Sequence, residues 1–233
     1  MTADGRGPPA PFLIRLAAAL ARAVLSSVAR VRVEVAGELP RQGPLIVVAN
    51  HLSNADPPLV VGWLTPLLGR QMHILAKEAL FVGPVGTLLR SQGVTPVRAG
   101  GSDMEAYRAA RAVLERGEVL CIFPEGTRSR TGHLGQARPG VAMLATRLGV
   151  PILPVGISGS ERFLPPGARL PRLGTRIRLR VGRPFRLQAA GGVSRRQAVE
   201  AGAVEIMRRL AGLVAPPNRG PYDPLLDTER APE

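Results

Sequence analysis

The sequence predicts a single α/β domain, a sandwich in which helices flank a largely parallel central sheet. Short apolar runs such as residues 45–49 and 119–123 are typical of strands that are buried on both faces. Most are followed by a segment with helical spacing of apolar residues, as in β-α units. The 233 residues are 45% apolar and 21% charged, enough for one sizeable core. No internal repeat or linker divides them.

The expected elements follow in order. Residues 1–10 are rich in Gly and Pro and are expected to be disordered, residues 31–215 to form the domain, and residues 216–233 to form a flexible tail. Strands are expected at 31–36, 45–49, 72–76, around Thr95, and at 119–123, 151–157 and 175–181. Helices are expected at 11–30, 57–68, 84–91, 102–116, 139–148 and 194–213. Ser102, with Glu105 three residues later, indicates a capping box for the helix at 102–116.

The helix expected at 11–30 is amphipathic. Its apolar residues recur at helical spacing, and Arg15, Arg22 and Arg30 lie on one side of it because they are seven and eight residues apart. Two interpretations stay open: an interfacial helix with its arginines at lipid headgroups, or a helix packed on the domain. Because arginines interrupt the apolar segment 11–28, it is predicted to be neither a spanning helix nor a signal peptide.

The chain is strongly basic, with a formal net charge of +14 and 31 Lys and Arg residues, of which only Lys77 is lysine. Part of this arginine bias can reflect coding composition. The excess predicts attraction to a polyanion, either nucleic acid or an anionic membrane. Near such a membrane each basic residue contributes about 1 kcal/mol. Charge alone does not choose between these partners.

Several classes are excluded by what the sequence lacks. The single cysteine, Cys121, excludes an internal disulfide and fits a reducing compartment. Three histidines and one cysteine are too few and too scattered for a structural zinc site, so no metal is expected. The segment GISGS at 156–160 lacks the second glycine of a serine-hydrolase elbow. Neither a phosphate-binding G-K-[ST] loop nor a dinucleotide-binding G-x-G-x-x-G is present.

The most informative segment is NHLSNADP at 50–57, between a buried strand and a helix. Loops at the carboxyl ends of parallel strands are where ligands bind. His51 titrates near neutrality and can take a proton from a hydroxyl. Asp56, five residues on, can fold back to fix the tautomer of His51 and stabilise its imidazolium. The alternative is structural, because Asp56 before Pro57 is also a good helix N-cap.

Three further segments carry polar or conformationally special residues. FPEGTRSR at 123–130 follows a strand and joins a glycine, a threonine hydroxyl and Arg128, whose guanidinium suits a phosphate. The alternative for this segment is a surface turn in which Glu125 and Arg128 pair. GVTPVR at 93–98 places Arg98 at the end of a short strand, and VPILPVG at 150–156 is an apolar strand with two prolines.

The four segments occur together in an order that resembles the glycerolipid acyltransferases, specifically the 1-acylglycerol-3-phosphate O-acyltransferases (lysophosphatidic acid acyltransferases). NHLSNAD resembles the family's His-x4-Asp block, GVTPVR its Gly-to-Arg block, FPEGTRSR its Glu-Gly-Thr-Arg block, and VPILPVG its proline-containing block. The resemblance runs from about residue 31 to 185 and includes KEALFVGP at 77–84. Family members often begin with a longer or more hydrophobic membrane-anchoring region. This sequence departs from that pattern, because it offers one arginine-bearing helix instead.

By this resemblance His51 is the general base and Asp56 its partner. It implies that a set of five residues holds the glycerol phosphate: Arg98, Glu125, Gly126, Thr127 and Arg128. The donor would be a thioester, acyl-CoA or acyl carrier protein, with no cofactor. Because one arginine-bearing helix must here serve as the anchor, peripheral attachment to the cytoplasmic face of the cell membrane is expected. No covalent acyl-enzyme is expected, because Cys121 lies in a predicted buried strand where a thiol is usually inert.

Two alternatives stay open. Similar motif sets serve other lyso-lipids, including lyso-ornithine lipids and glycosylated phosphoinositides, and the arginines could instead bind the phosphates of coenzyme A. A basic nucleic-acid-binding protein is the distant alternative. Its best support is residues 169–186, where Arg176, Arg178 and Arg180 lie on one strand face. Against it stands the aromatic content of 3%, since stacking residues are nearly absent.

Overall fold

The computed structural model describes residues 12–77, 82–83, 94–97, 103–165, 167–168, 170–188 and 194–223. The strands are β1 (Ala29–Val35), β2 (Leu45–Ala49), β3 (Met72–Lys77), β4 (Val94–Val97), β5 (Val119–Ile122), β6 (Ile152–Ser158) and β7 (Thr175–Val181). The α-helices are α1 (Phe12–Val28), α2 (Asp56–Leu68), α4 (Asp103–Glu115), α5 (Pro139–Leu148), α6 (Ser160–Phe163) and α7 (Arg195–Ala211). Three expectations fall outside the described residues: the helix at 84–91, the capping box at Ser102, and the position of Arg98.

The described strands form one sheet in the order β1-β7-β6-β2-β5-β3-β4. Neighbouring strands are parallel except β6 and β7, which pair antiparallel with Val155 opposite Val181. Strand β1, expected at 31–36, pairs parallel with β7 and forms one edge of the sheet. The predicted fold class, an α/β domain with a largely parallel central sheet and an N-terminal helix, is confirmed.

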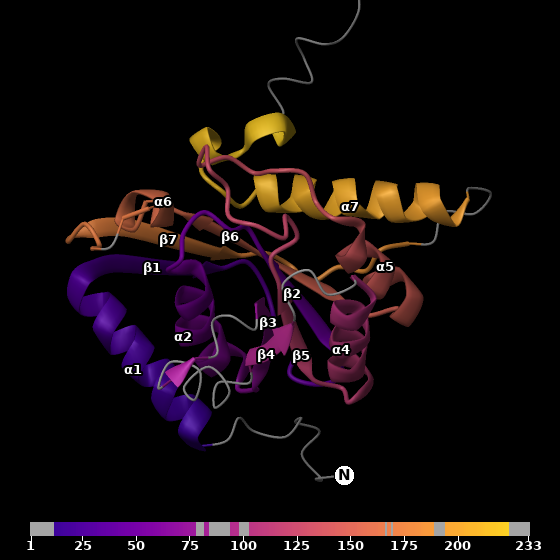
Figure 1. Cartoon of the computed structure of the whole chain (residues 1–233), viewed down its shortest axis with the longest axis horizontal. Coiled ribbons are helices and arrows are strands. Elements are labelled where there is room, and N and C mark those ends of the chain that lie inside the picture. Colours follow the sequence, from indigo (N-terminus) through magenta and orange to yellow (C-terminus); the bar gives the residue numbers. More distant parts are fainter. Residues whose placement is uncertain are drawn as a thin grey trace, which may run out of the picture.

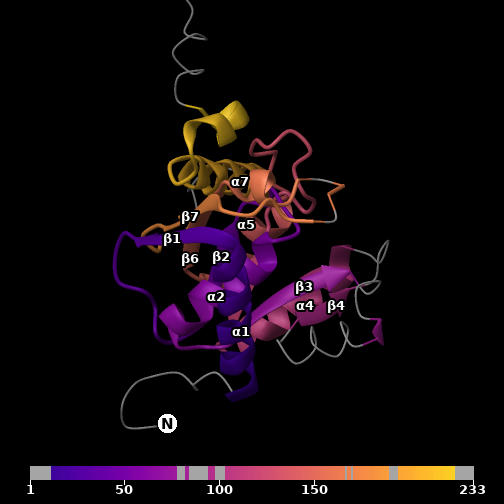
Figure 2. The same ribbon diagram turned by 90° about the vertical axis from the view of Figure 1, so that its left-hand side faces the viewer.

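Helices cover both faces of the sheet (Figures 1 and 2). Strand β2 lies in the middle, and all five of its residues are fully buried, as the uncharged run predicted. Its side chains alternate between two cores. Val47 points into the core shared with α1 and α2. Ile46 points into the core shared with α4, α5 and α7.

Helix α1 packs on α2 through one face, which carries the buried residues Ile14, Ala18 and Leu25. Gly62 of α2 lets the helices approach closely, because a Cβ there would lie 3.2 Å from Cγ of Arg22. The packed interpretation of this helix is therefore correct for one face. Among the described residues, no helix combines the length and the apolar character that crossing a membrane requires.

The structure differs from the expected flexible tail at 216–223. These residues form two short 3-10 helices, Pro216–Asn218 and Gly220–Tyr222. Asn218 is buried; its Nδ2 donates to the carbonyl of Gly132 at 2.7 Å, and its own carbonyl accepts from Leu134 N–H at 2.8 Å. Prolines that suggested a loose segment instead fix the φ angles at the start of each turn.

Candidate active site

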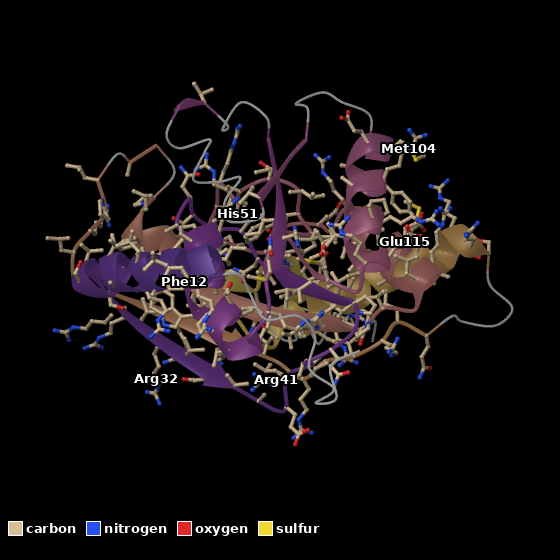
Figure 3. All side chains as sticks on the ribbon, turned by 90° about the horizontal axis from the view of Figure 1, so that it is seen from below. Phe12, Arg32, Arg41, His51, Met104 and Glu115 are labelled. Atoms are coloured by element: carbon tan, nitrogen blue, oxygen red, sulfur yellow. The ribbon has the colours of Figure 1, made fainter. Side chains whose placement is uncertain are left out.

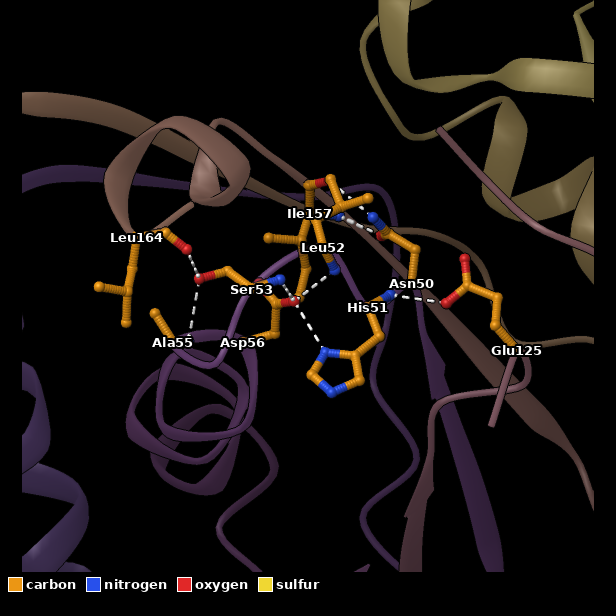
Figure 4. Close-up of polar contacts among 9 residues, drawn as sticks. All are labelled: Asn50, His51, Leu52, Ser53, Ala55, Asp56, Glu125, Ile157 and Leu164. Carbon is orange, nitrogen blue, oxygen red and sulfur yellow. Dashed lines mark hydrogen bonds and ion pairs between the residues drawn. The ribbon is translucent and has the colours of Figure 1, made fainter. Parts of the chain in front are cut away.

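An imidazole and a carboxylate meet at the carboxyl end of β2. Nδ1 of His51 lies 3.0 Å from Oδ2 of Asp56 (Figure 4). The Asp56 side chain is fully buried, whereas the His51 side chain keeps 17% of its surface exposed. The contact that the His-x4-Asp spacing predicted is therefore present, with the ring at the surface and the carboxylate beneath it.

Asp56 does not act as the helix N-cap that the structural alternative required. Helix α2 has no side-chain cap, and Pro57 occupies its first turn. Instead, the same Oδ2 atom accepts the N–H groups of Leu52 and Ser53, each at 2.6 Å. These charge-assisted bonds hold the loop around the carboxylate and fix its position under the imidazole. Its other oxygen, Oδ1, is buried without a partner among the described residues.

The loop is also tied to the strand and segment beside it. The side-chain amide of Asn50 donates to the carbonyl of Ile157 at 2.9 Å and accepts its N–H at 2.7 Å. Ser53 Oγ donates to the carbonyl of Leu164 at 2.9 Å. Both contacts are drawn in Figure 4. Because residues before and after His51 are anchored, the backbone that carries the imidazole is preorganised.

The imidazole is further oriented by an aromatic ring. Phe123 stacks on it with 4.4 Å between centroids and 29° between planes. The second ring nitrogen, Nε2, is directed away from Asp56 in Figure 4. No hydrogen bond from the described protein groups reaches it. A ring held in this way by Asp56 can use Nε2 to accept a proton.

Glu125 joins the second polar segment to the first. Its Oε2 accepts the backbone N–H of His51 at 2.8 Å, and its Oε1 accepts that of Gly135 at 3.4 Å. Burial raises the pKa of Glu125 from 4.5 to about 7; the two N–H groups oppose this shift, and the Asp56 carboxylate adds to it. Glu125 thus binds backbone amides and is not paired with Arg128, contrary to the surface-turn alternative.

The Glu-Gly-Thr-Arg loop lies beside the dyad. Gly126 has φ of +69°, a conformation that favours glycine. The carbonyl of His51 accepts the N–H of Ser129 at 2.8 Å, which closes the loop onto the histidine. Thr127 is exposed and Arg128 half-buried on this loop. The structure thus brings His51, Asp56, Glu125 and Gly126 together, while Arg98 lies outside the described residues.

Sequence reasoning missed two residues here. Phe123 enters the sequence argument only as the first residue of a motif, although an aromatic residue directly after a strand, at the edge of the sheet where His51 lies, is a usable signal. Arg138 was not singled out, yet a Cβ on Gly126 would lie 2.5 Å from its Nε, so its side chain lies directly over that glycine. Its backbone N–H donates to the carbonyl of Pro124 at 2.8 Å. Its only sequence signal was a basic residue just before a helix.

Cys121, the single cysteine of the chain, is not an activated nucleophile. Cys121 lies buried in β5, and burial raises the pKa of its thiol to about 12, which keeps it protonated and unreactive. Within the described part of the chain, no cluster of three or more His, Cys, Asp or Glu residues could hold a metal ion.

Comparison with known proteins identifies the family. The family model described as Acyltransferase matches residues 30–158, more than half of the chain. The chain belongs to the Acyltransferase family. The matched residues contain the His51–Asp56 contact, Phe123 and the Glu-Gly-Thr-Arg loop.

The chain is also similar to individual members of this family. It is 32% identical over 138 residues to 1-acyl-sn-glycerol-3-phosphate acyltransferase alpha of Homo sapiens, covering 57% of this chain and 48% of that protein. It is 37% identical over 144 residues to the lyso-ornithine lipid O-acyltransferase of Pseudomonas aeruginosa, covering 61% and 53%. The crystal structure of the 1-acyl-sn-glycerophosphate (LPA) acyltransferase PlsC from Thermotoga maritima superposes with a TM-score of 0.67 at 25% identity, over 86% of this chain and 79% of that one.

The chain spans about half the length of these curated relatives, and only 36% of the chloroplastic acyltransferase BAT2 of Brassica napus, to which it is 30% identical. None of these comparisons supports the nucleic-acid-binding alternative. The arginines that suggested it lie on β7, where Arg178 and Arg180 pair with Glu34 of β1 at 3.7 and 3.0 Å. The hydrogen bond from Arg180 lowers the pKa of Glu34.

Proposed function

We propose that this acyltransferase-family chain moves a fatty acyl group from acyl-CoA or acyl carrier protein to the free hydroxyl of a lysophospholipid. The observation that carries the proposal is the His51 imidazole, bonded to buried Asp56 through Nδ1 and open at Nε2. The acceptor that the human relative's name favours is 1-acylglycerol-3-phosphate, which would give phosphatidic acid.

The reaction uses the dyad as a general base. The acceptor hydroxyl attacks the thioester carbonyl while Nε2 of His51 takes its proton. Asp56 stabilises the imidazolium through Nδ1. The tetrahedral oxyanion then collapses, the new ester keeps the acyl group, and the carbon–sulfur bond breaks. The thiolate leaves and takes up the proton that the imidazolium returns. No acyl-enzyme forms, which agrees with the buried, protonated state of Cys121.

The acceptor's phosphate is assigned to the Glu-Gly-Thr-Arg loop. Arg128 and the newly identified Arg138 supply guanidinium groups, which suit phosphate oxygens. Gly126 has no side chain and lets a phosphate approach the backbone closely. Arg98 and the Thr127 hydroxyl complete the proposed binding set. Glu125 also belongs to this proposed set, and its Oε2 accepts the backbone N–H of His51.

The similarity to a lyso-ornithine lipid O-acyltransferase keeps a second acceptor class in view. Such an acceptor carries no phosphate, so the arginines beside Gly126 would then face a carboxylate or the phosphates of coenzyme A. For either acceptor we propose peripheral attachment at the cytoplasmic face of the membrane. The arginine-bearing α1 and the net charge of +14 support attraction to anionic lipid.

The deciding experiment supplies purified protein with labelled acyl-CoA or acyl carrier protein and a panel of lyso-acceptors. Product is expected with 1-acylglycerol-3-phosphate and is expected to disappear in His51→Ala. His133→Ala is the matched control, because His133 is exposed and bonds Pro217 rather than Asp56. Full activity in His51→Ala would refute the base assignment. If product forms only with lyso-ornithine lipid, that lipid replaces 1-acylglycerol-3-phosphate as the proposed acceptor.

A further inference from the structure

The segment between α6 and β7 exposes two large apolar side chains. Leu170 is 81% and Leu173 74% exposed. The backbone next to Leu173 is fixed, because Arg172 N–H donates to the carbonyl of Phe163 at 2.8 Å and Thr175 Oγ1 donates to the carbonyl of Arg172 at 2.6 Å. Neither leucine belongs to either core, and side chains this exposed suit contact with an apolar partner.

A second set of exposed apolar side chains runs along α1. Phe12, Leu16, Leu20 and Val24 recur every four residues on the side away from α2, and each is more than half exposed. The opposite side of the helix carries the residues buried against α2. Helix α1 thus has two apolar faces, of which the domain covers one.

These two sets meet. The N–H of Gly174, directly after Leu173, donates to the carbonyl of Val28, the last residue of α1, at 2.8 Å. Figure 1 places α1 and the segment between α6 and β7 on the same side of the molecule. We call the six exposed side chains the apolar rim: Phe12, Leu16, Leu20, Val24, Leu170 and Leu173.

The rim also adjoins the candidate active site. Ser53, two residues after His51, donates through Oγ to the carbonyl of Leu164, at the start of the segment that carries the two leucines. The loop that holds the dyad and the loop that holds Leu170 and Leu173 are therefore bonded neighbours. A partner seated on the rim would therefore contact a segment that is bonded to the active-site loop.

Charge identifies the partner. Arg15 and Arg22 on α1 and Arg172 beside Leu173 are exposed, and Arg176 is exposed at the start of β7. The aliphatic stem of Arg22 packs on Gly62, which leaves its charged end free to reach headgroups. An apolar strip bordered by arginines suits a bilayer with anionic headgroups. A second copy of this chain would bring another net charge of +14 and would be repelled.

We propose that the apolar rim docks on an anionic bilayer, and that Leu170 and Leu173 form a second contact, beyond α1, that holds the active-site loop at the lipid surface. This assignment rests on the proposed function for its biological purpose, because a lipid acceptor must pass from the bilayer to His51. The docking itself does not depend on which acceptor is used.

The test is sedimentation with phosphatidylcholine vesicles, with and without phosphatidylglycerol. The wild type is expected to bind the anionic vesicles preferentially. The Leu170→Ser/Leu173→Ser variant is expected to bind them at least about tenfold more weakly, since each leucine loses its transfer free energy to the bilayer. Met104→Ser is the matched control, because Met104 is 54% exposed on α4, away from Phe12 in Figure 3.

A second readout compares acyl transfer to an acceptor in vesicles with transfer to a short-chain acceptor dissolved as monomers. The double variant is expected to lose rate only with vesicles. The single Leu173→Ser variant should give an intermediate loss. Vesicle binding equal to wild type in the double variant would overturn the proposal, as would equal binding to neutral and anionic vesicles. Normal vesicle docking without transfer to any acceptor would overturn the proposed function alone.

Discussion

The backbone N–H of His51 donates a 2.8 Å hydrogen bond to Oε2 of Glu125, which lies 74 residues further along the chain. This bond joins the His-x4-Asp segment to the Glu-Gly-Thr-Arg segment. Asp56 holds the imidazole from one side and Glu125 holds the backbone from the other. Each of these partners can be changed separately, so their contributions can be measured one at a time.

Asp56→Asn is expected to lower kcat/KM by about 10²–10⁴-fold. The asparagine oxygen is expected to keep the place of Oδ2, because the N–H groups of Leu52 and Ser53 donate there, so the loss comes from removing the negative charge that stabilises the imidazolium. Nitrogen NMR of labelled histidine should show that the proton of the neutral ring stays on Nδ1. A variant that keeps the wild-type rate would show that the contact is structural.

Phe123→Ala is expected to reduce kcat by about tenfold and leave KM for the acceptor little changed. The stacked ring fixes the orientation of His51, and the Phe123 carbonyl, which accepts the N–H of Gly126 at 3.0 Å, is kept in the variant. Steady-state kinetics separate the two parameters. Phe123→Tyr keeps the ring and serves as the control. An effect confined to KM would place Phe123 in substrate binding instead.

Glu125→Gln is expected to change how stability depends on pH. Burial raises the pKa of folded Glu125 from 4.5 to about 7, so folding favours the protonated acid. Its stabilising contribution is complete below about pH 4.5 and is lost as the pH rises to about 7. The free energy of unfolding of the wild type relative to the variant should therefore fall by up to about 3 kcal/mol over this range.

Urea denaturation at several pH values measures this difference. The wild-type curve minus the Glu125→Gln curve should be flat above the upper end of that window. A difference that grows with pH would mean that Glu125 is stabilised in its ionised form, contrary to its burial.

Gly126→Ala is expected to destabilise the fold by about 1–2 kcal/mol, because φ of +69° strains any residue with a Cβ. The new Cβ would also displace the Arg138 side chain. In an Arg138→Ala background the clash disappears and only the strain remains. The cost of Gly126→Ala in that background should be smaller, and a double-mutant cycle in urea measures the coupling. Additive effects would show that Arg138 moves aside freely.

Native protein is expected to resist thiol reagents. Cys121 is buried and the pKa of its thiol is about 12, so little thiolate forms at neutral pH. Modification by a chromogenic disulfide should become complete only in denaturant. Rapid labelling of the folded protein would reopen the question of a covalent intermediate.

Much of the fold was predictable because its signals are local. The uncharged run at 45–49 and the helix at 139–148, which begins at a proline and ends before a glycine, occur where the pattern indicated. The close approach of His51 and Asp56 was also predictable, since Asp56 lies five residues after His51 and the loop between strand and helix can fold back over that length.

The remaining features depend on contacts between distant segments. Nothing local in the sequence shows that Glu125 faces the His51 amide, or that Arg138 lies over Gly126. The turns at 216–223 are held by Asn218, whose partners lie near residue 133, so a proline-rich tail was the natural interpretation. The choice between a packed and an interfacial α1 could not be made because the two descriptions apply to different faces of the same helix.

The antiparallel step between β6 and β7 has a wider consequence. It turns β7, and β1 with it, against the direction of the other five described strands. The segment that precedes a strand lies at the border of the sheet where that strand begins. A strand that runs in the opposite direction begins at the border where its neighbours end. The segments that lead into β1 and β7 therefore reach the same border of the sheet as the loops that leave β2 and β5. With every strand in one direction, α1 would have arrived at the far border, remote from His51.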